Sequence, residues 1–353
     1  MTRLIQGQVD RLRNGYPKKK NGEVFDDLHF PLCVERPVVL LSAVQKARAS
    51  SEESTMSKLI RKANVLIEAL PYIRTFRGKT IVIKYGGNAM TESSLKERFA
   101  QDIVLLKYVG LNPVIIHGGG PQIDKMLDRL GIESKFLHGV RVTNEATMEI
   151  VEMVLAGKIN MEITDLINRH GGSAVGLSGK DGGLILSKPL TARAWAESLE
   201  RDLDGDDAES DFGFVGDIEK VDPSLLFKLQ GDHYIPVIAP IGTDREGNTY
   251  NINADLVAGA VAGALHAEKL VMMTDIKGIR DAKGRHLSTV SRKDVQRMVK
   301  KGTITEGMLP KVHACLDALE QGVGKAHIID GRMPHAILLE VFTRKGIGTE
   351  ITA

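Results

Sequence analysis

The stretch Thr80-Ile-Val-Ile-Lys-Tyr-Gly-Gly87 decides the fold, because a β-branched strand in it runs directly into a glycine turn. Further along, Pro113-Val-Ile-Ile-His-Gly-Gly-Gly120 repeats this order of strand and glycine turn. Continuous Val/Ile strands that alternate with helical segments are typical of a parallel sheet covered on both faces. We therefore expect an α/β fold, a mostly parallel open sheet sandwiched between helices, with ligands at the carboxyl ends of the strands.

The same alternation continues to the C-terminus. Further buried strands are expected at residues 174–177, 184–186, 234–239, 269–273 and 326–329. Helices are expected at 93–109, from 121 onward, twice between 144 and 170, and at 254–266, 306–321 and 332–342. Residues 191–211 are polar and acidic, which predicts an exposed insertion or hairpin whose role the sequence leaves open.

The N-terminal region differs from the rest of the chain. Residues 1–55 combine a basic cluster with scattered acids, which fits neither a secretory signal nor a transit peptide, and we expect a poorly ordered extension. Apolar residues then recur at three- and four-residue spacing, which predicts an amphipathic helix within 56–78 with Ser57 as its N-cap. Pro71 is expected to bend or break this helix near its last turn. Whether Met1 or Met56 is the native start stays open.

Composition excludes several classes of protein. The formal net charge of +2 gives no indication of a nucleic-acid partner, and the apolar runs are too short to span a membrane. The two cysteines, Cys33 and Cys315, exclude a disulfide scaffold and a cysteine-based zinc site, and they fit the reducing cytoplasm.

The two glycine turns have the chemistry of anion-binding loops. Glycine lets backbone N–H groups approach a phosphate or carboxylate closely, and a following helix adds its positive N-terminal dipole. The alternative is a pair of tight turns without a ligand, which is less favoured because both follow buried strands. Neither G-x-x-x-x-G-K-[ST] nor G-x-G-x-x-G occurs, so the common nucleotide loops are absent.

Two lysines and one aspartate are candidates for phosphoryl transfer. Lys84 ends a strand just before a glycine turn, and Lys311 lies where a helix begins, a position that disfavours a cation unless an anion joins it. On spacing alone we favour for Asp255 a plain role as an acid that stabilises the first turn of a helix, and the alternative is that it holds both lysines. Each lysine could equally be a solvated surface charge. We interpret His117 as structural.

Taken together, five segments resemble the amino-acid kinase family, from about Ser57 to the C-terminus. They are Ile83-Lys-Tyr-Gly-Gly-Asn-Ala-Met90, His117-Gly-Gly-Gly-Pro-Gln-Ile123, His138-Gly-Val-Arg-Val-Thr143, Tyr250-Asn-Ile-Asn-Ala-Asp255 and Thr305-Glu-Gly-Met-Leu-Pro-Lys311. Within the family they are most similar to members that phosphorylate the γ-carboxylate of N-acetyl-L-glutamate in arginine biosynthesis, with ATP and Mg²⁺.

The resemblance implies a role for each matching residue. Lys84 and Lys311 would stabilise the transferring phosphoryl group, and Asp255 would organise them. Acetylglutamate would be bound in a lobe at 79–235, and ATP in a lobe at 236–353. The implied acetylglutamate contacts are Gly119, Gly120, Arg141 and Asn251, and the implied ATP contacts are Gly86, Gly87, Asp275, Gly278 and Thr305.

The N-terminal helix is similar to that of family members that form hexamers and are inhibited by L-arginine, whereas shorter members are dimers. The resemblance therefore implies a homo-oligomer and an arginine site with Lys220, His327 and Glu340 as candidates. Two alternatives remain: a kinase of the same fold for glutamate or aspartate, and a non-catalytic amino-acid sensor. The Arg141 and Asn251 segments argue against the first, and the presence of both lysines argues against the second.

Overall fold

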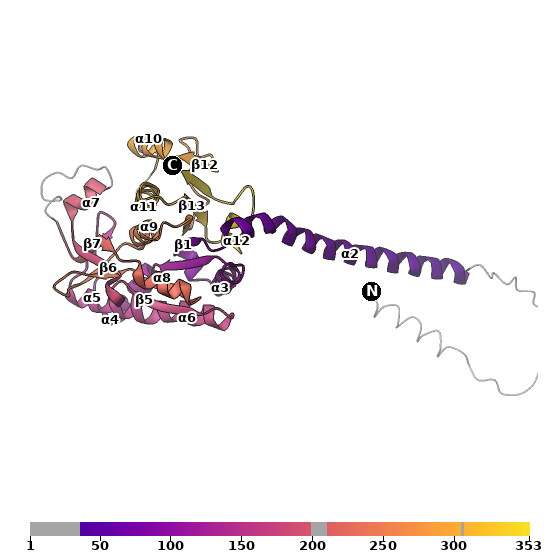
Figure 1. Cartoon of the computed structure of the whole chain (residues 1–353), viewed down its shortest axis with the longest axis horizontal. Helices are drawn as coiled ribbons and strands as arrows, with labels where there is room; N and C mark the ends of the chain where they lie inside the picture. The colour runs from indigo at the N-terminus through magenta and orange to yellow at the C-terminus, as the bar shows by residue number, and fades with distance from the viewer. Residues whose placement is uncertain (1–35, 199–209, 305–306) are drawn as a thin grey trace, which may run out of the picture. The chain divides into compact units, whose positions relative to one another are not determined.

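The computed structural model describes residues 36–198, 210–304 and 307–353, with the backbone alone for 36–55 (Figure 1). The chain divides into two units, Met1–Asn64 and Val65–Ala353. Every strand described below belongs to the second unit.

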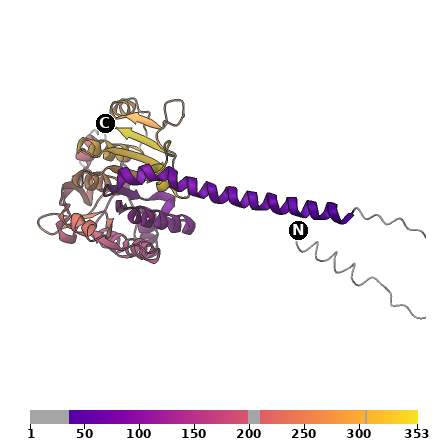
Figure 2. The same cartoon turned by 45° about the vertical axis from the view of Figure 1, so that its right-hand side comes forward.

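An eight-stranded sheet forms the centre of the unit Val65–Ala353 within the described residues. Its strands, in spatial order, are β12 (Thr289–Ser291), β14 (Thr349–Thr352), β13 (Lys325–Asp330), β11 (Lys269–Thr274), β1 (Thr80–Tyr85), β2 (Asn112–His117), β8 (Ile235–Ala239) and β5 (Ala174–Ser178). Every pairing from β13 to β5 is parallel, whereas β14 runs antiparallel to β13. The short strands β12 and β14, orange and yellow, lie together at one edge (Figure 2). The expected mostly parallel open sheet is confirmed.

Two hydrophobic cores cover the two faces of this sheet. In β1, Ile81 and Ile83 belong to one core and Val82 to the other, because successive strand residues point to opposite faces. Helices α3 (Ser93–Tyr108) and α6 (Asn160–Arg169) contribute to the first core. Helices α9 (Ala254–Ala264) and α11 (Leu309–Glu320), which lie side by side, contribute to the second (Figure 1). Burial on both faces explains why the strand sequences are continuously apolar.

One cysteine of the chain lies in the second core. Cys315, on α11, has no exposed surface, and burial raises the pKa of its thiol.

Four strands outside the sheet close into a small barrel: β6 (Ile185–Thr191), β7 (Asp211–Val221), β9 (Ile241–Thr243) and β10 (Thr249–Asn251). Strands β6 and β7 pair antiparallel, which confirms the hairpin expected around residues 191–211. The expected exposure is wrong for part of α7 (Ala192–Ser198), because Trp195 belongs to the second hydrophobic core and is only 4 % exposed. Residues 199–209 lie outside the described part of the chain.

The N-terminal helix differs from expectation in two ways. Helix α2 runs from Arg36 to Phe76, so residues 36–55 are helical and not the poorly ordered chain that we expected. Residues 36–55 are rich in good helix formers such as Ala, Leu, Lys, Arg and Glu. Composition alone therefore did not distinguish a helix from a loose extension in this region. The helix also continues through Pro71, which removes only one hydrogen bond close to the helix end. The extension predicted for residues 1–35 lies outside the described residues.

The remaining elements complete the two layers. The expected pair of helices between 144 and 170 is one run, in which α5 (Glu145–Glu152), a π-helix η2 (Met153–Ile159) and α6 follow each other directly. The C-terminal helix α12 (Ala336–Val341) is shorter than expected. The others are α4 (Gly120–Leu130), α8 (Ser224–Gly231), α10 (Arg292–Lys300), the hairpin β3 (Phe136–Leu137) and β4 (Val140–Arg141), and the 3₁₀ turns η1 (Gly87–Met90) and η3 (Asp181–Gly183). Among the described residues, no helix is both long and apolar enough to cross a membrane.

Candidate active site

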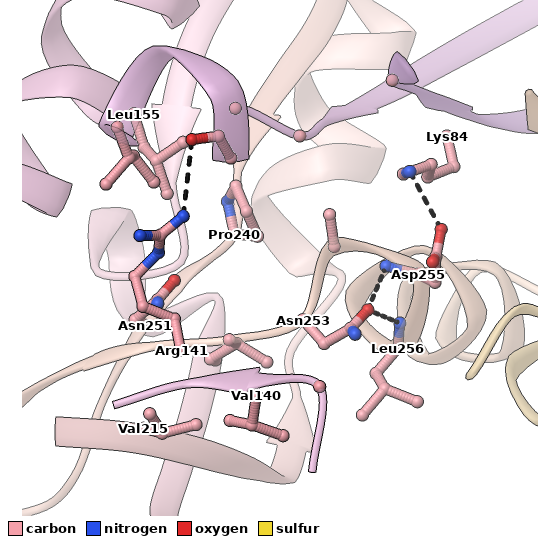
Figure 3. A pocket seen from close by; sticks show the side chains of 18 of the residues that line it. Lys84, Val140, Arg141, Leu155, Val215, Pro240, Asn251, Asn253, Asp255 and Leu256 are labelled. Atoms are coloured by element: carbon pink, nitrogen blue, oxygen red, sulfur yellow. Dashed lines mark hydrogen bonds and ion pairs between the residues drawn. The ribbon is translucent and has the colours of Figure 1, made fainter. Parts of the chain in front are cut away.

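One buried carboxylate joins the two candidate lysines. The Nζ atom of Lys84 lies 3.0 Å from one carboxylate oxygen of Asp255, and the Nζ atom of Lys311 donates to the other oxygen at 2.8 Å. Figure 3 shows Lys84 directed at Asp255. Burial alone would raise the pKa of Asp255, but the charges of the two lysines outweigh it and lower the pKa to about 2. These contacts join the three residues into one ion-paired group.

Local sequence explains how the three residues come together. Asn253 caps α9 and accepts hydrogen bonds from the N–H groups of Asp255 and Leu256, which fixes Asp255 in the first turn (Figure 3). Gly259 lets α9 and α11 approach closely, since a Cβ atom there would lie 2.7 Å from the Ala314 carbonyl oxygen. This close approach brings Lys311, on the first turn of α11, to Asp255.

The first glycine turn gives Lys84 room and is held by an aspartate. A Cβ atom at Gly86 would lie 2.6 Å from the Lys84 ammonium, so glycine leaves this side chain free to lie over the turn. Gly87 adopts φ +67°, and the next residue, Asn88, donates its N–H to Asp275 at 2.8 Å. Asp275 follows β11, the neighbour of β1, and therefore fixes the turn from the next strand.

The second glycine turn lies beside the first, because β1 and β2 are adjacent and in register from Thr80–Asn112 to Tyr85–His117. It is closely packed from behind, since a Cβ atom at Gly119 would lie 2.5 Å from side-chain atoms of Leu155 and Ile159. His117 has no exposed surface; its Nδ1 lies 2.9 Å from the Gly118 carbonyl oxygen and its Nε2 lies 3.2 Å from the Asn160 amide nitrogen. These contacts agree with a structural role for His117.

A cavity of about 330 Å³ opens in front of both turns. Most of the predicted catalytic and substrate residues line it: Lys84, Gly86, Gly87, Gly119, Gly120, Arg141, Asn251 and Asp255. The Lys84–Asp255 pair and Arg141 lie at different ends of this cavity in Figure 3.

Arg141 is held in place before any ligand binds. Its guanidinium donates to Asp124 at 2.6 Å and to Ser134, and it lies 4.5 Å above the Phe136 ring. The hydrogen bond from Arg141 lowers the pKa of Asp124 and keeps that partner ionised. A second guanidinium nitrogen reaches only the Gly120 carbonyl, at 3.4 Å (Figure 3). Arg141 is therefore pre-oriented with donors facing the cavity.

The remaining nucleotide-site predictions lie away from this cavity or outside the described residues. Asp275 acts on the glycine turn, and Gly278, at φ +135°, packs against Thr349, where a Cβ atom would be 2.4 Å from the hydroxyl oxygen. Thr305 lies outside the described part of the chain. Among the described residues, no cluster of three or more His, Cys, Asp or Glu side chains could hold a metal ion.

His327 and Glu340, two of the three effector candidates, meet in another cavity of about 340 Å³. Their side chains are 2.7 Å apart, and Lys269 continues the chain, 3.0 Å from the His327 ring. Phe76, from the end of α2, lies 5.1 Å beneath the Lys269 ammonium. The structure does not bring Lys220 to this cavity, because it lies on β7 of the barrel, paired with Leu186.

Sequence reasoning missed several residues of both cavities. Trp195 and Phe136 line the first, and Lys269 and Phe76 line the second. The one available signal was that Trp195 is the only tryptophan of the chain, inside a polar stretch. The others lie in ordinary strand or helix patterns, which carry no indication of a site.

Known proteins resemble both the sequence and the fold. The profile of the amino acid kinase family matches residues 79–330. An acetylglutamate kinase of a Sulfurihydrogenibium species is 57 % identical over 303 residues, covering 84 % of this chain and all of the relative. An acetylglutamate kinase of Geotalea uraniireducens is 58 % identical over 296 residues, covering 84 % of this chain and 99 % of the relative.

Solved structures give a similar result. N-acetylglutamate synthase from Neisseria gonorrhoeae, in complex with coenzyme A and N-acetylglutamate, is 28 % identical with a TM-score of 0.71, covering 82 % of this chain and 63 % of that one. Carbamate kinase from Giardia lamblia bound to AMP-PNP is 17 % identical with a TM-score of 0.55, covering 78 % and 98 %, and shows the fold alone. From its sequence and its fold, this chain belongs to the amino acid kinase family.

Proposed function

We propose that this chain transfers the γ-phosphoryl group of ATP to the γ-carboxylate of N-acetyl-L-glutamate, a step of arginine biosynthesis. The observation that carries the proposal is the Lys84–Asp255 pair at one end of a cavity that has Arg141 at the other, with Lys311 paired to the same Asp255 carboxylate. Relatives named acetylglutamate kinase at 57 % and 58 % identity support the choice of substrate.

The chemistry needs charge neutralisation more than acid–base catalysis. The γ-carboxylate is already ionised at neutral pH, so its oxygen attacks the γ-phosphorus directly while the bond to ADP breaks. Lys84 and Lys311 offset the negative charge of the transferring group, and Asp255 holds both ammonium groups at that point. The product is an acyl phosphate.

The remaining assignments belong to the same proposal. Arg141 binds the α-carboxylate through its free donors, with Asn251 and the N–H groups of Gly119 and Gly120 beside it. The nucleotide lies on the side of residues 236–353, where we assign Asp275, Gly278 and Thr305, and it reaches the turn at Gly86 and Gly87. Mg²⁺ enters with ATP and adds to the neutralisation of phosphate charge.

The test is turnover of ATP with N-acetylglutamate, with glutamate and aspartate as comparison substrates and hydroxylamine to trap the acyl phosphate. Lys84→Ala is expected to lower kcat by roughly 100- to 1000-fold, the range seen when one pre-oriented donor is lost. Lys79→Ala is the matched control, because Lys79 flanks the same strand and its side chain is 54 % exposed.

The outcomes separate the alternatives. Turnover restricted to the acetylated substrate and lost in Lys84→Ala supports the proposal. Faster turnover of glutamate or aspartate would replace the substrate, and no turnover with any of the three would favour a sensor.

We also propose that L-arginine inhibits the reaction from the cavity around His327 and Glu340. Buried Glu340 and the neighbouring Glu350 offer carboxylates to a guanidinium, and Lys269 and Lys325 offer cations to a carboxylate. The end of α2 contributes Tyr72 and Phe76 to the same cavity.

Arginine titration of the activity tests this proposal. Glu340→Gln is expected to raise the inhibitory concentration at least about tenfold, the effect of losing one charge-assisted pair. Lys220→Ala, on the barrel, should leave inhibition unchanged. Full activity of the wild type at millimolar arginine would refute the proposal.

We further propose self-association through α2, which carries an exposed apolar row. Met56, Leu59, Ile60, Leu66 and Ile67 are each more than half exposed, at 53–72 %. Light scattering should give a mass of several chains, and a lower mass for a variant with Leu59 and Leu66 changed to Glu. A wild-type monomer would contradict this proposal.

A further inference from the structure

The only tryptophan of the chain lines the substrate cavity. Trp195 lies on α7, in the connection between β6 and β7, and it is 4 % exposed. Its indole Nε1–H donates to the carbonyl oxygen of His138 at 3.2 Å. His138 and Gly139, with φ of +50° and +80°, form the tight turn between β3 and β4. The indole hydrogen bond therefore links the β6–β7 connection to the β3–β4 turn.

The turn that Trp195 holds belongs to the hairpin that carries Arg141. Phe136 on β3 pairs with Arg141 on β4, and the guanidinium lies over the Phe136 ring. Gly139, Phe136 and Arg141 all line the cavity with Trp195. Any displacement of this hairpin would therefore move the group that we assign to the α-carboxylate.

The geometry also indicates which part of the substrate Trp195 faces. A γ-carboxylate that accepts the phosphoryl group must point to Lys84, so the α-carbon with its two substituents lies at the Arg141 end of the cavity. Val140 and Val215 lie at that end in Figure 3, and Phe136 packs against the Arg141 guanidinium. Trp195, bonded to the β3–β4 turn, and Leu190 add further apolar lining to the cavity. An N-acyl group fits such a wall, whereas a free ammonium would lose its hydration there without a partner.

The charges of the residues that line the cavity also favour an N-acyl group over a free ammonium. Asp255 is the only acid among the described residues that line the cavity, and it is already paired with Lys84 and Lys311. The cavity thus offers an α-ammonium no free carboxylate. Discrimination for acylated amino acids then depends on how closely the apolar wall fits the acyl group.

We propose that Trp195 is a positioning and specificity-determining residue: it holds the β3–β4 hairpin over the amino-acid substrate and limits the size of the N-acyl group. This inference rests on the proposed function. It concerns the acceptor end of the site and leaves ATP binding and the phosphoryl-transfer step unaffected.

The first test separates KM from kcat. Trp195→Phe keeps an aromatic ring and removes the N–H donor, so KM for N-acetylglutamate should rise roughly 5- to 10-fold, the effect of one buried hydrogen bond. KM for ATP and kcat should stay within about twofold, because the hydrogen bond of the indole goes to the β3–β4 turn and not to the lysine pair. Phe227→Leu, a half-exposed aromatic on α8, is the control and should change none of these constants.

The second test uses acyl groups of increasing size. Trp195→Ala should raise kcat/KM for N-propionyl- and N-butyrylglutamate relative to N-acetylglutamate by about tenfold or more, because one methylene in a fitted pocket is worth at least that much. An unchanged KM in Trp195→Phe would overturn the positioning role, and an unchanged acyl preference in a folded Trp195→Ala would overturn the specificity role. If Trp195→Ala does not fold, the same acyl series is measured with Trp195→Leu.

Tryptophan fluorescence keeps this inference distinct from the proposed function. Since Trp195 is the sole tryptophan, titration of the wild type with N-acetylglutamate should change its emission without any turnover. A saturable change without phosphoryl transfer would refute the kinase and leave the acceptor pocket standing. Turnover without a change in emission would leave the kinase standing and count against the role of Trp195.

Discussion

At the scale of single residues, the site depends on groups whose charge is fixed near neutral pH. Asp255 titrates at about 2, far below neutrality, so it remains a carboxylate between its two lysines wherever the protein is folded and active. The activity should therefore not depend on titration of Asp255 above about pH 4.

His117 links pH to stability. Burial lowers its pKa from 6.5 to about 4, so the unfolded chain binds a proton at a higher pH than the folded one. Stability is then lost as the pH falls from about 6.5 towards 4. Relative to His117→Asn, the wild type should lose about 2 kcal/mol more of its free energy of unfolding between pH 7 and pH 5.

Urea unfolding of both proteins at the two pH values measures this difference. Other titrating groups contribute equally to both and cancel. Equal losses in the wild type and the variant would mean that His117 is charged or solvated in the folded state.

Single residues were predictable where a motif marks them. Lys84, Asp255, Lys311 and Arg141 occur in segments whose order is specific, and the structure brings all four to one site. Lys220, which none of the matching segments contains, does not join His327 and Glu340, because it lies on β7 of the barrel. Lining residues such as Lys269 and Phe136 become neighbours of the sites only through tertiary contacts, which no local pattern encodes.

At the scale of elements, the π-helix η2 packs its side chains directly behind the second glycine turn. Gly119→Ala would place a Cβ atom 2.5 Å from Leu155 and Ile159, both on η2. We expect this overpacking to lower the free energy of unfolding by about 1–3 kcal/mol.

Gly118→Ala, in the same turn, is the matched comparison for stability. Its Cβ atom would meet nothing closer than the Tyr85 carbonyl oxygen at 3.9 Å, so stability should change by less than about 1 kcal/mol. Thermal unfolding of the two variants measures the difference. Equal melting temperatures would mean that η2 yields to the added methyl group.

Elements with strong periodicity were predictable, and those defined by their partners were not. Strands β1, β2, β8, β11 and β13 and helices α3 and α9 lie within a few residues of the expected positions. The short strands β12 and β14 near one edge of the sheet and the barrel strands β9 and β10 have three or four residues each, too few for a period to be visible. The early start of α2 was missed because the stretch Ala49-Ser-Ser-Glu-Glu-Ser54, just before the expected helix, is also typical of an unstructured extension.

At the scale of the whole molecule, all described residues of both cavities belong to the unit Val65–Ala353. A chain that begins at Met56 should therefore keep kcat and both KM values within about twofold, since no site contact is removed. Its melting temperature should remain within about 2 °C, because the two cores stay complete.

Steady-state kinetics and calorimetry of the shortened protein check this expectation. A comparison chain that begins at residue 79 removes Tyr72 and Phe76 as well and should lose arginine inhibition while it keeps activity. Loss of activity in the chain from Met56 would assign a functional role to residues 1–55.

Because Cys315 is buried, the rate at which its thiol reacts reports how often this part of the molecule opens. A thiol with a raised pKa and no exposed surface does not react with alkylating reagents until α11 separates from the sheet. In a Cys33→Ser background, the rate of mass gain during slow alkylation would count those separations under native conditions. A bound ligand that holds Lys311 against Asp255 would lower the alkylation rate of Cys315. The affinity of that ligand could then be measured from a reaction at a residue that does not contact it.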